Sequence, residues 1–162
     1  MLEITAATIR SCFVNATKKE LADLVLPDLP ETDWDRLDYL GWRDPKLSKR
    51  AYIVVPLAQG PVGIVLKQAE ASPRTRAQCS WCQDITLPND VVLYGARRSG
   101  SAGRNGNTVG TLICSDFECS SNVRKLPPSA YIGFDVEAAR TRRIETLRTR
   151  STDFATGIVE GS

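Results

Sequence analysis

The spacing of the cysteines constrains this chain more than any other feature of its sequence. Four of the five cysteines form two close pairs, Cys79 with Cys82 and Cys114 with Cys119, and Cys12 stands apart. Two short-spaced thiolate pairs are a common donor set for a structural zinc ion, which takes four ligands at the corners of a tetrahedron. The sequence therefore predicts one structural Zn2+ held by these four thiolates.

Paired cysteines can also form disulfides, stay as buried free thiols or carry out thioredoxin-like redox chemistry. After Met1 there is neither a cationic segment nor an apolar run long enough for a secretory signal, so we expect a cytoplasmic location. Disulfides are rare in that reducing compartment. Redox chemistry would explain one pair and leave the other without a role. Zinc binding is therefore favoured, with free thiols or disulfides as the alternatives.

The composition favours a small protein that works by binding. With 162 residues, of which 42% are hydrophobic, the chain can build one ordinary core and has no apolar stretch of transmembrane length. It contains no histidine, which excludes mixed Cys/His zinc sites, Ser-His-Asp triads and Cys-His dyads. A zinc ion with four thiolate ligands has no open position for substrate. We expect no enzymatic activity, no small-molecule substrate and no membrane association.

Charge is distributed unevenly along the chain. The net charge of +2 is too small to indicate nucleic-acid binding by itself. Residues 28–44 contain six acids and two arginines, whereas residues 91–115 contain three arginines and no acid. The three arginines, Arg97, Arg98 and Arg104, would suit recognition of phosphate or carboxylate groups.

The predicted fold class is α+β, beginning with an N-terminal helical segment at residues 1–45. Apolar residues at helical spacing predict a short helix within 4–14, and a capping box from Thr17 to Glu20 predicts the start of a second. Prolines at 27 and 30 mark the end of this helical region. Cys12 would be a small core residue of the first helix.

Residues 46–162 are expected to form antiparallel β-hairpins, the zinc module and a long C-terminal helix, in one compact unit with the first segment. β-Branched runs at 52–56 and 62–66 around a Gly/Pro turn predict a hairpin. Pro56 would end its strand or lie at a sheet edge. Residues 69–78 would connect this hairpin to the first cysteine pair.

A second hairpin is predicted between the two cysteine pairs, with strands at 90–96 and 108–113 and a glycine-rich loop at 99–107. Residues five apart on a helix point about 140° from each other, so Cys114 and Cys119 cannot share one helical face. We expect Cys114 at a strand end, Asp116 as a helix N-cap and Cys119 in the first helical turn. This arrangement is a treble clef.

The C-terminal segment from Phe134 predicts one long helix. Its apolar residues recur at three- and four-residue steps, and this stripe should dock on the sheet. The stripe consists of Ile144, Leu147, Phe154 and Ile158. The arginines of this helix are interpreted as a solvated face, with a partner-binding surface as the alternative. Gly157 and Gly161 predict a frayed end.

The functional surface should be the part of the chain that the metal holds in place. The candidate partner contacts are Trp81, Arg97, Arg98, Arg104 and Asn105. Trp81 could instead pack against its own knuckle, and the Asn-Gly step in the hairpin loop is typical of an ordinary turn. The loop lacks the lysine and hydroxyl residue of a P-loop, so nucleotide binding is not expected.

Three motifs follow one another along the chain. They are Tyr39-Leu40-Gly41-Trp42-Arg43-Asp44-Pro45, Cys79-Ser80-Trp81-Cys82, and Gly103-Arg104-Asn105-Gly106-Asn107-Thr108-Val109-Gly110-Thr111 running into Cys114. Together they resemble the elongation factor G-binding protein family, the FusB-type fusidic acid resistance proteins, in their short actinobacterial form. The resemblance covers nearly the whole chain.

The resemblance implies a treble-clef zinc domain that binds elongation factor G and helps release it from ribosomes stalled by fusidic acid. It implies the four paired cysteines as zinc ligands and places Trp81, Arg104 and Asn105 near the family's partner contacts. The chain looks shorter than full-length resistance proteins and lacks much of their N-terminal helical bundle. The alternative function is a zinc-stabilised RNA- or ribosome-binding module that touches rRNA phosphates through Arg97, Arg98 and Arg104.

Overall fold

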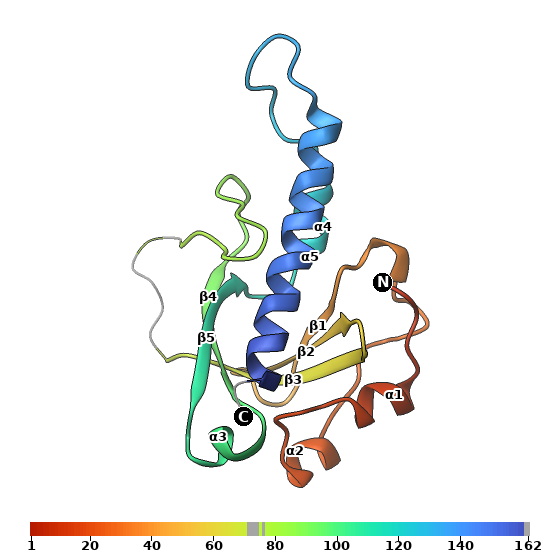
Figure 1. Cartoon of the computed structure of the whole chain (residues 1–162), viewed down its shortest axis with the longest axis vertical. Coiled ribbons are helices and arrows are strands. Elements are labelled where there is room, and N and C mark those ends of the chain that lie inside the picture. Colours follow the sequence, from red (N-terminus) through yellow and green to blue (C-terminus); the bar gives the residue numbers. More distant parts are fainter. Residues whose placement is uncertain (71–74, 76, 161–162) are drawn as a thin grey trace.

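A five-stranded antiparallel sheet lies at the centre of the computed structural model, which describes residues 1–70, 75 and 77–160. Its strands follow the order of the chain. They are β1 (Leu40–Arg43), β2 (Arg50–Leu57), β3 (Gly60–Gln68), β4 (Val91–Arg97) and β5 (Thr108–Cys114). Helices surround the sheet (Figure 1), which confirms the predicted α+β class.

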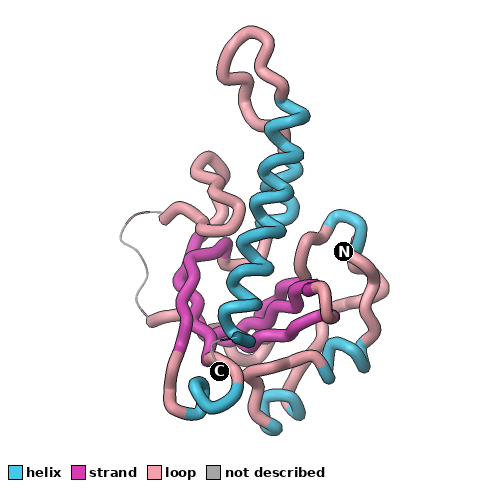
Figure 2. Tube along the Cα trace, viewed as in Figure 1, coloured by secondary structure: helices cyan, strands magenta, loops and turns pink. Residues whose placement is uncertain are grey.

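One long helix lies across a face of the sheet, and the other helices are short (Figures 1 and 2). The helices are α1 (Ala6–Ser11), α2 (Lys18–Ala22), the 3-10 helix η1 (Trp34–Arg36), α3 (Gly100–Arg104), α4 (Cys119–Arg124) and α5 (Val136–Glu160). The capping box at the start of α2 is confirmed. None of the helices in the described part is both long enough and apolar enough to span a membrane.

Strand β1 was not predicted from the sequence. Leu40 and Trp42 alternate with Gly41 and Arg43, but four residues among acids are too short a run to indicate a strand. In the structure β1 pairs with residues 51–54 of β2. The predicted helical segment, 1–45, therefore also contains a strand, and its division from residues 46–162 stays a prediction.

The first predicted hairpin is confirmed as β2 and β3, which pair from Arg50↔Lys67 to Leu57↔Gly60. Pro56 lies beyond the part of β2 that pairs with β1, so its missing N–H falls on an unpaired edge, as expected. Much of the connection predicted at 69–78, residues 71–74 and 76, lies outside the described residues.

The sheet narrows between β3 and β4, which share only two residue pairs, Lys67↔Gly95 and Gln68↔Tyr94. The N-terminal chain pairs with the free edge of β3. The Gly63 N–H donates to the Cys12 carbonyl at 2.9 Å, and the Val14 N–H donates to the Gly63 carbonyl at 3.0 Å. The thiol of Cys12 donates to the carbonyl of Ile9, and burial raises its pKa to about 11. Cys12 follows α1 as its C-cap and packs, partly buried, against the core around Ile9, so it lies at the edge of the core and not inside it as predicted.

Helix α5 buries the predicted apolar stripe against the sheet. Leu147 and Ile158 are fully buried with Ile53 and Ile113, and the other two predicted residues pack against the same core. The expected fraying at Gly157 is wrong: the helix continues to Glu160. Its last turn is held by the two residues that follow β4, since Arg98 donates to the Gly157 carbonyl and the Ser99 N–H to that of Ile158. Gly161 lies outside the described residues.

A buried carboxylate joins three parts of the fold. The side chain of Asp38 is 0% exposed and accepts hydrogen bonds from Arg124 of α4 at 2.5 Å and Arg148 of α5 at 2.8 Å. Its backbone N–H donates to Ser120. Burial acts to raise the pKa of Asp38, but the two guanidinium groups hold it below its usual value. Arg148 of the predicted solvated face thus also has a structural role.

Replacing Asp38 with Asn should lower the free energy of unfolding by about 3 kcal/mol at neutral pH, because two arginines lose their buried counter-charge. The folded pKa is lowered, so the carboxylate stabilises the fold above its unfolded pKa of about 3.9 and stops doing so as the pH falls through the folded value. The stability difference between wild type and variant should therefore shrink below about pH 4.

Denaturant unfolding of both proteins at neutral and acidic pH measures this difference, with the zinc content of each protein determined at each pH. Asp35→Asn, which changes an exposed carboxylate of η1, is the control. A difference that stays constant through the acid range would contradict the ion-pair assignment.

Candidate metal centre

The four predicted ligands meet at one end of the β4–β5 hairpin. Cys114 is the last residue of β5, Cys119 is the first residue of α4, and Cys79 and Cys82 lie in a turn before β4. All four side chains are buried, and their sulfur atoms lie within 4.8 Å of one another. Cys114 at a strand end and Cys119 in the first helical turn confirm the predicted treble-clef geometry.

The sulfur distances fit a zinc tetrahedron. The Cys79 and Cys119 sulfurs are 3.6 Å apart, and those of Cys82 and Cys114 are 3.7 Å apart. With Zn–S bonds of about 2.3 Å, a tetrahedron has S–S edges of about 3.8 Å. A disulfide needs about 2.05 Å, and all four cysteines are free. The donor set therefore fits one Zn2+, which would close the centre by taking all four thiolates.

The first cysteine pair lies in a tight turn. The Cys82 N–H points at the Cys79 sulfur at 3.4 Å, and the Gln83 N–H donates to the Cys79 carbonyl at 3.0 Å. Gln83 has a φ of 57°, in the left-handed region that non-glycine residues rarely adopt. The turn thus directs one N–H toward a sulfur ligand at the expense of local strain.

The second cysteine pair also encloses a left-handed residue, Phe117, with a φ of 63°. Its N–H donates to the Cys114 carbonyl at 3.1 Å. The prediction of Asp116 as the N-cap is wrong, because this turn occupies the residues after Cys114 and the helix begins only at Cys119. Glu118 takes the N-cap position, but its side chain accepts from Asn89 and from the Asp116 N–H and does not cap the helix. In the described part of the chain, the two left-handed non-glycine residues, this one and Gln83, both adjoin the cysteines.

The four sulfurs cannot all be charged without a cation. Hydrogen bonds from the other thiols, Cys114 first, lower the pKa of Cys79, and the same set of contacts raises the pKa of Cys119. The pKa of Cys82 is also lowered and that of Cys114 is raised, so two thiolates are stabilised at the cost of the other two, whereas a bound dication stabilises all four. The Asn122 amide adds donors to the Cys114 sulfur at 3.5 Å and the Cys82 sulfur at 3.8 Å.

Aromatic rings separate the centre from the rest of the sheet. Tyr39 lies edge-on to Trp81 at 4.9 Å between ring centres, and Phe117 stacks on Tyr94 at 5.5 Å. Burial, followed by the charge of the nearby Cys119 sulfur, raises the pKa of Tyr39. The Phe117 ring lies directly over Gly41 of β1, where a Cβ would be 2.5 Å from its Cγ.

The structure divides the predicted partner contacts between two places. Trp81 is buried at the zinc end, 2% exposed between Tyr39 and Phe154, as its packing alternative predicts. The other four residues, Arg97, Arg98, Arg104 and Asn105, lie at the opposite end of the hairpin. Seven residues of β5 place the two ends roughly 20 Å apart. All five contacts stay predictions.

At the far end, two of the arginines are used within the fold. Arg97 pairs with Glu20 of α2 at 2.7 Å, and Arg98 donates to the Gly157 carbonyl. Arg104 and Asn105 are exposed. The glycine-rich segment 99–107 was predicted as a loop, but it contains the short helix α3. Gly103 is needed there, since a Cβ would lie 1.8 Å from the Arg98 carbonyl oxygen.

Asn122 was not predicted as part of the site. It lies three residues after Cys119 in α4, and residues at that spacing share a helix face. That spacing is a usable signal for a polar residue beside a metal ligand. Asp38, which fixes α4 from the other side, gives no comparable signal in the sequence because it lies 86 residues from Arg124.

Comparison with known proteins gives two results. A family model described as "FBP C-terminal treble-clef zinc-finger" matches residues 8–158. The solved structure titled "Structure of the fusidic acid resistance protein FusC" is similar with a TM-score of 0.56 at 23% sequence identity, over 75% of this chain and 53% of that chain. The likeness to FusC therefore concerns the fold, and this chain spans about half of that protein. Comparison with curated protein sequences gave no match.

Replacing Cys114 with Ser should release the metal, because zinc binding supplies much of the folding free energy of such a centre. We expect loss of stoichiometric zinc and a fall in the melting temperature on the order of 10 °C. Elemental analysis and thermal unfolding measure the two effects. Cys12→Ser, at the cysteine outside the centre, should keep its zinc. Full zinc content in the Cys114 variant would refute the assignment.

Replacing Gly41 with Ala should strain the second cysteine turn, because the new methyl group overlaps the Phe117 ring. We expect a loss of about 1–3 kcal/mol in the free energy of unfolding and faster zinc transfer to a chelator. Gly95→Ala is the matched control, since its nearest neighbour is the Lys67 oxygen at an ordinary 3.9 Å. Equal effects of the two substitutions would argue against the overlap.

Proposed function

Since the chain belongs to the FBP C-terminal treble-clef zinc-finger family, whose model matches residues 8–158, we propose that it is a zinc-stabilised protein that binds elongation factor G. Binding would promote release of the factor from ribosomes stalled by fusidic acid, in the cytoplasm. The family match carries this proposal. The fold likeness to FusC, a fusidic acid resistance protein, is consistent with it.

The centre supports a role in binding and not in catalysis. Four thiolates fill the coordination sphere of zinc, so a bound ion would have no position for water or substrate. When bound, zinc would fix the turn at Cys79–Cys82, the end of β5 and the start of α4 relative to one another. These elements would present a rigid surface to the partner, and rigidity lowers the entropic cost of association.

Release of the factor does not require a catalysed reaction. A protein that binds preferentially to a conformation of the factor that cannot stay on the ribosome shifts the population toward the free factor. The shift is limited by the difference in affinity between the two conformations. The drug itself would be left unchanged.

Two of the three arginines in the RNA-binding alternative form contacts within the fold and Arg104 stays exposed, which favours a protein partner over RNA. Arg97 is paired with Glu20, Arg98 with a helix carbonyl, and Arg148 with Asp38. Guanidinium groups committed to such contacts are poor sites for phosphate, and the net charge of the whole chain is only +2. RNA binding without a factor complex would therefore contradict this proposal.

Binding of the zinc-loaded chain to purified elongation factor G, followed by sedimentation of fusidic acid-stalled ribosomes with and without the chain, tests the proposal. We expect a stable complex and less factor in the ribosomal pellet. Tight binding to rRNA fragments that weakens steeply with salt, without any complex with the factor, would instead support the RNA-binding alternative.

Replacing Arg104 with Glu should weaken association with elongation factor G by about tenfold, because it reverses an exposed charge at the hairpin tip. Zinc content should not change. Arg36→Glu makes the same change of charge in η1 and is the control. If the two variants bind the factor equally well, the hairpin tip is not part of the contact surface.

A further inference from the structure

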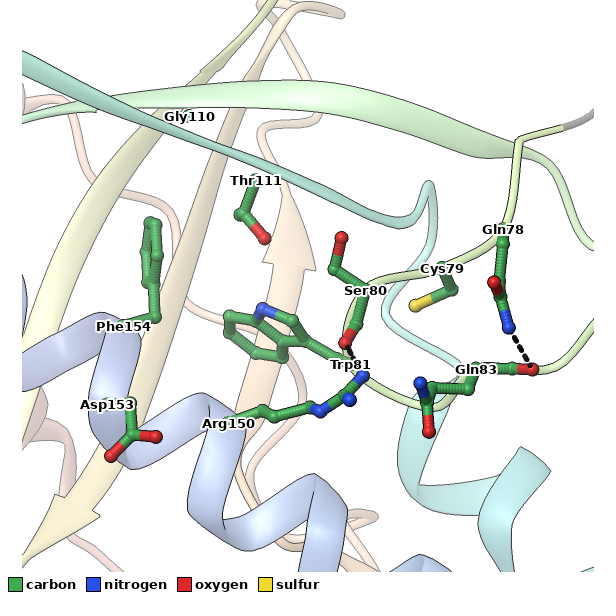
Figure 3. A pocket seen from close by; sticks show the side chains of 10 residues that line it. All are labelled: Gln78, Cys79, Ser80, Trp81, Gln83, Gly110, Thr111, Arg150, Asp153 and Phe154. Atoms are coloured by element: carbon green, nitrogen blue, oxygen red, sulfur yellow. Dashed lines mark hydrogen bonds between the residues drawn. The ribbon is translucent and has the colours of Figure 1, made fainter.

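A pocket of about 480 Å3 lies between the first cysteine turn, β5 and α5. Figure 3 shows the rings of Trp81 and Phe154 side by side along it, with Thr111 on the β5 side and Arg150 and Asp153 on the α5 side. Its volume is in the range of pockets that take a small molecule or a side chain, about 300–1,000 Å3. The metal centre supplies one wall through Cys79 and its neighbours.

Two hydrogen-bonding groups face this pocket without a partner. The Trp81 side chain is 2% exposed, and its indole N–H forms no hydrogen bond within the described part of the chain, although the nitrogen itself is not fully buried. The Thr111 hydroxyl, on a residue 8% exposed, has no hydrogen bond there either. By contrast, the Trp42 indole donates to the Val25 carbonyl at 2.9 Å. Neither the Trp81 nitrogen nor the Thr111 oxygen is fully buried, so both can be reached through the pocket, which is therefore suited to a ligand that carries an acceptor.

The charges at the pocket mouth have different roles. The Arg150 guanidinium donates to the Ser80 carbonyl, and it also bonds to the Gln83 amide oxygen when that amide is oriented to suit both groups. It is therefore occupied by the cysteine turn. The Asp153 carboxylate is exposed and forms no hydrogen bond or ion pair with any described residue. An acceptor thus stands at the rim and two donors stand inside.

This pattern discriminates between ligand classes. A phosphate or carboxylate would be repelled by Asp153, and the nearest guanidinium is already engaged. An ammonium or guanidinium group could pair with Asp153 but has no acceptor for the Trp81 N–H. A carboxamide has both the acceptor and the donor that the pocket requires. Its oxygen can accept from Trp81 and Thr111, and its NH2 group can donate to Asp153.

We propose that this pocket is a carboxamide-binding site that takes an Asn or Gln side chain from a segment of the partner protein. This inference rests on the proposed function for the identity of the partner, elongation factor G. The amide plane lies against the Trp81 and Phe154 rings, and its polar atoms meet the unpaired groups. A partner side chain that becomes buried in such a pocket is the kind of contact in which a protein interface concentrates its affinity.

The first experiment examines the pocket alone, with acetamide as the probe. In zinc-loaded protein labelled with 15N, the Trp81 indole N–H resonance, identified by its absence in Trp81→Phe, should shift saturably with acetamide and not with acetate. Thr111→Val and Asp153→Asn should weaken the acetamide response at least about threefold, since the first loses a hydrogen bond and the second replaces a charged acceptor with a neutral one. No shift, or an equal response to acetate, would overturn the inference.

The second experiment measures affinity for purified elongation factor G. Thr111→Val and Asp153→Asn should each weaken binding about threefold to tenfold, because the first removes a hydroxyl and the second replaces a charged acceptor with a neutral one, while the shape of each side chain is kept. Glu145→Gln, at an exposed carboxylate elsewhere on α5, is the matched control. Zinc content and melting temperature confirm that all variants are folded.

The two failures are distinguishable. If the wild-type chain binds the factor but the pocket variants bind as tightly as Glu145→Gln, the pocket inference is wrong and the proposed function stands. If the wild-type chain binds no factor, the proposed function is wrong, and the inferred partner with it. The acetamide response then decides whether the pocket recognises a carboxamide at all.

Discussion

Repulsion among four sulfur ligands is the constraint on which the rest of the structure depends. The sequence places their thiolates in a small buried volume that only a dication makes stable. That ion would connect a turn before β4, the end of β5 and the start of α4. Helix α4 then extends the connection, because Ser120 and Arg124 hold Asp38, and Arg148 of α5 binds the same carboxylate. The position of the metal is thereby linked to that of the N-terminal segment.

Features with a local cause could be predicted from the sequence. The cysteine spacing, the capping box, the two hairpins and the long helix each depend on a repeating pattern or a turn that neighbouring residues determine. Strand β1 could not be predicted this way, since four residues become a strand only when β2 lies beside them. The ion pairs of Asp38 could not be predicted either, because Arg124 and Arg148 lie 86 and 110 residues away in the sequence.

The errors have a common origin in backbone geometry. Asp116 was expected to cap α4, but the left-handed Phe117 lengthens the turn and delays the helix. The glycines of 99–107 indicated a loop, yet one of them, Gly103, allows a helical turn to pass against the Arg98 carbonyl. In both cases close packing and not residue preference decided the conformation. The indole N–H of Trp81 likewise became a candidate binding group only once its surroundings were known.

The narrow junction between β3 and β4 affects how the sheet behaves as a whole. Two residue pairs join the meander β1–β3 to the hairpin that carries the metal ligands, and the amide of Asn15 bridges the same gap by bonding to the carbonyls of Val65 and Arg97. We infer that so few ladder bonds let the two parts of the sheet open separately, even though Ile53 and Leu66 share one core with Ile113. Amide exchange in the metal-bearing half would therefore follow metal occupancy, while the meander keeps its own protection.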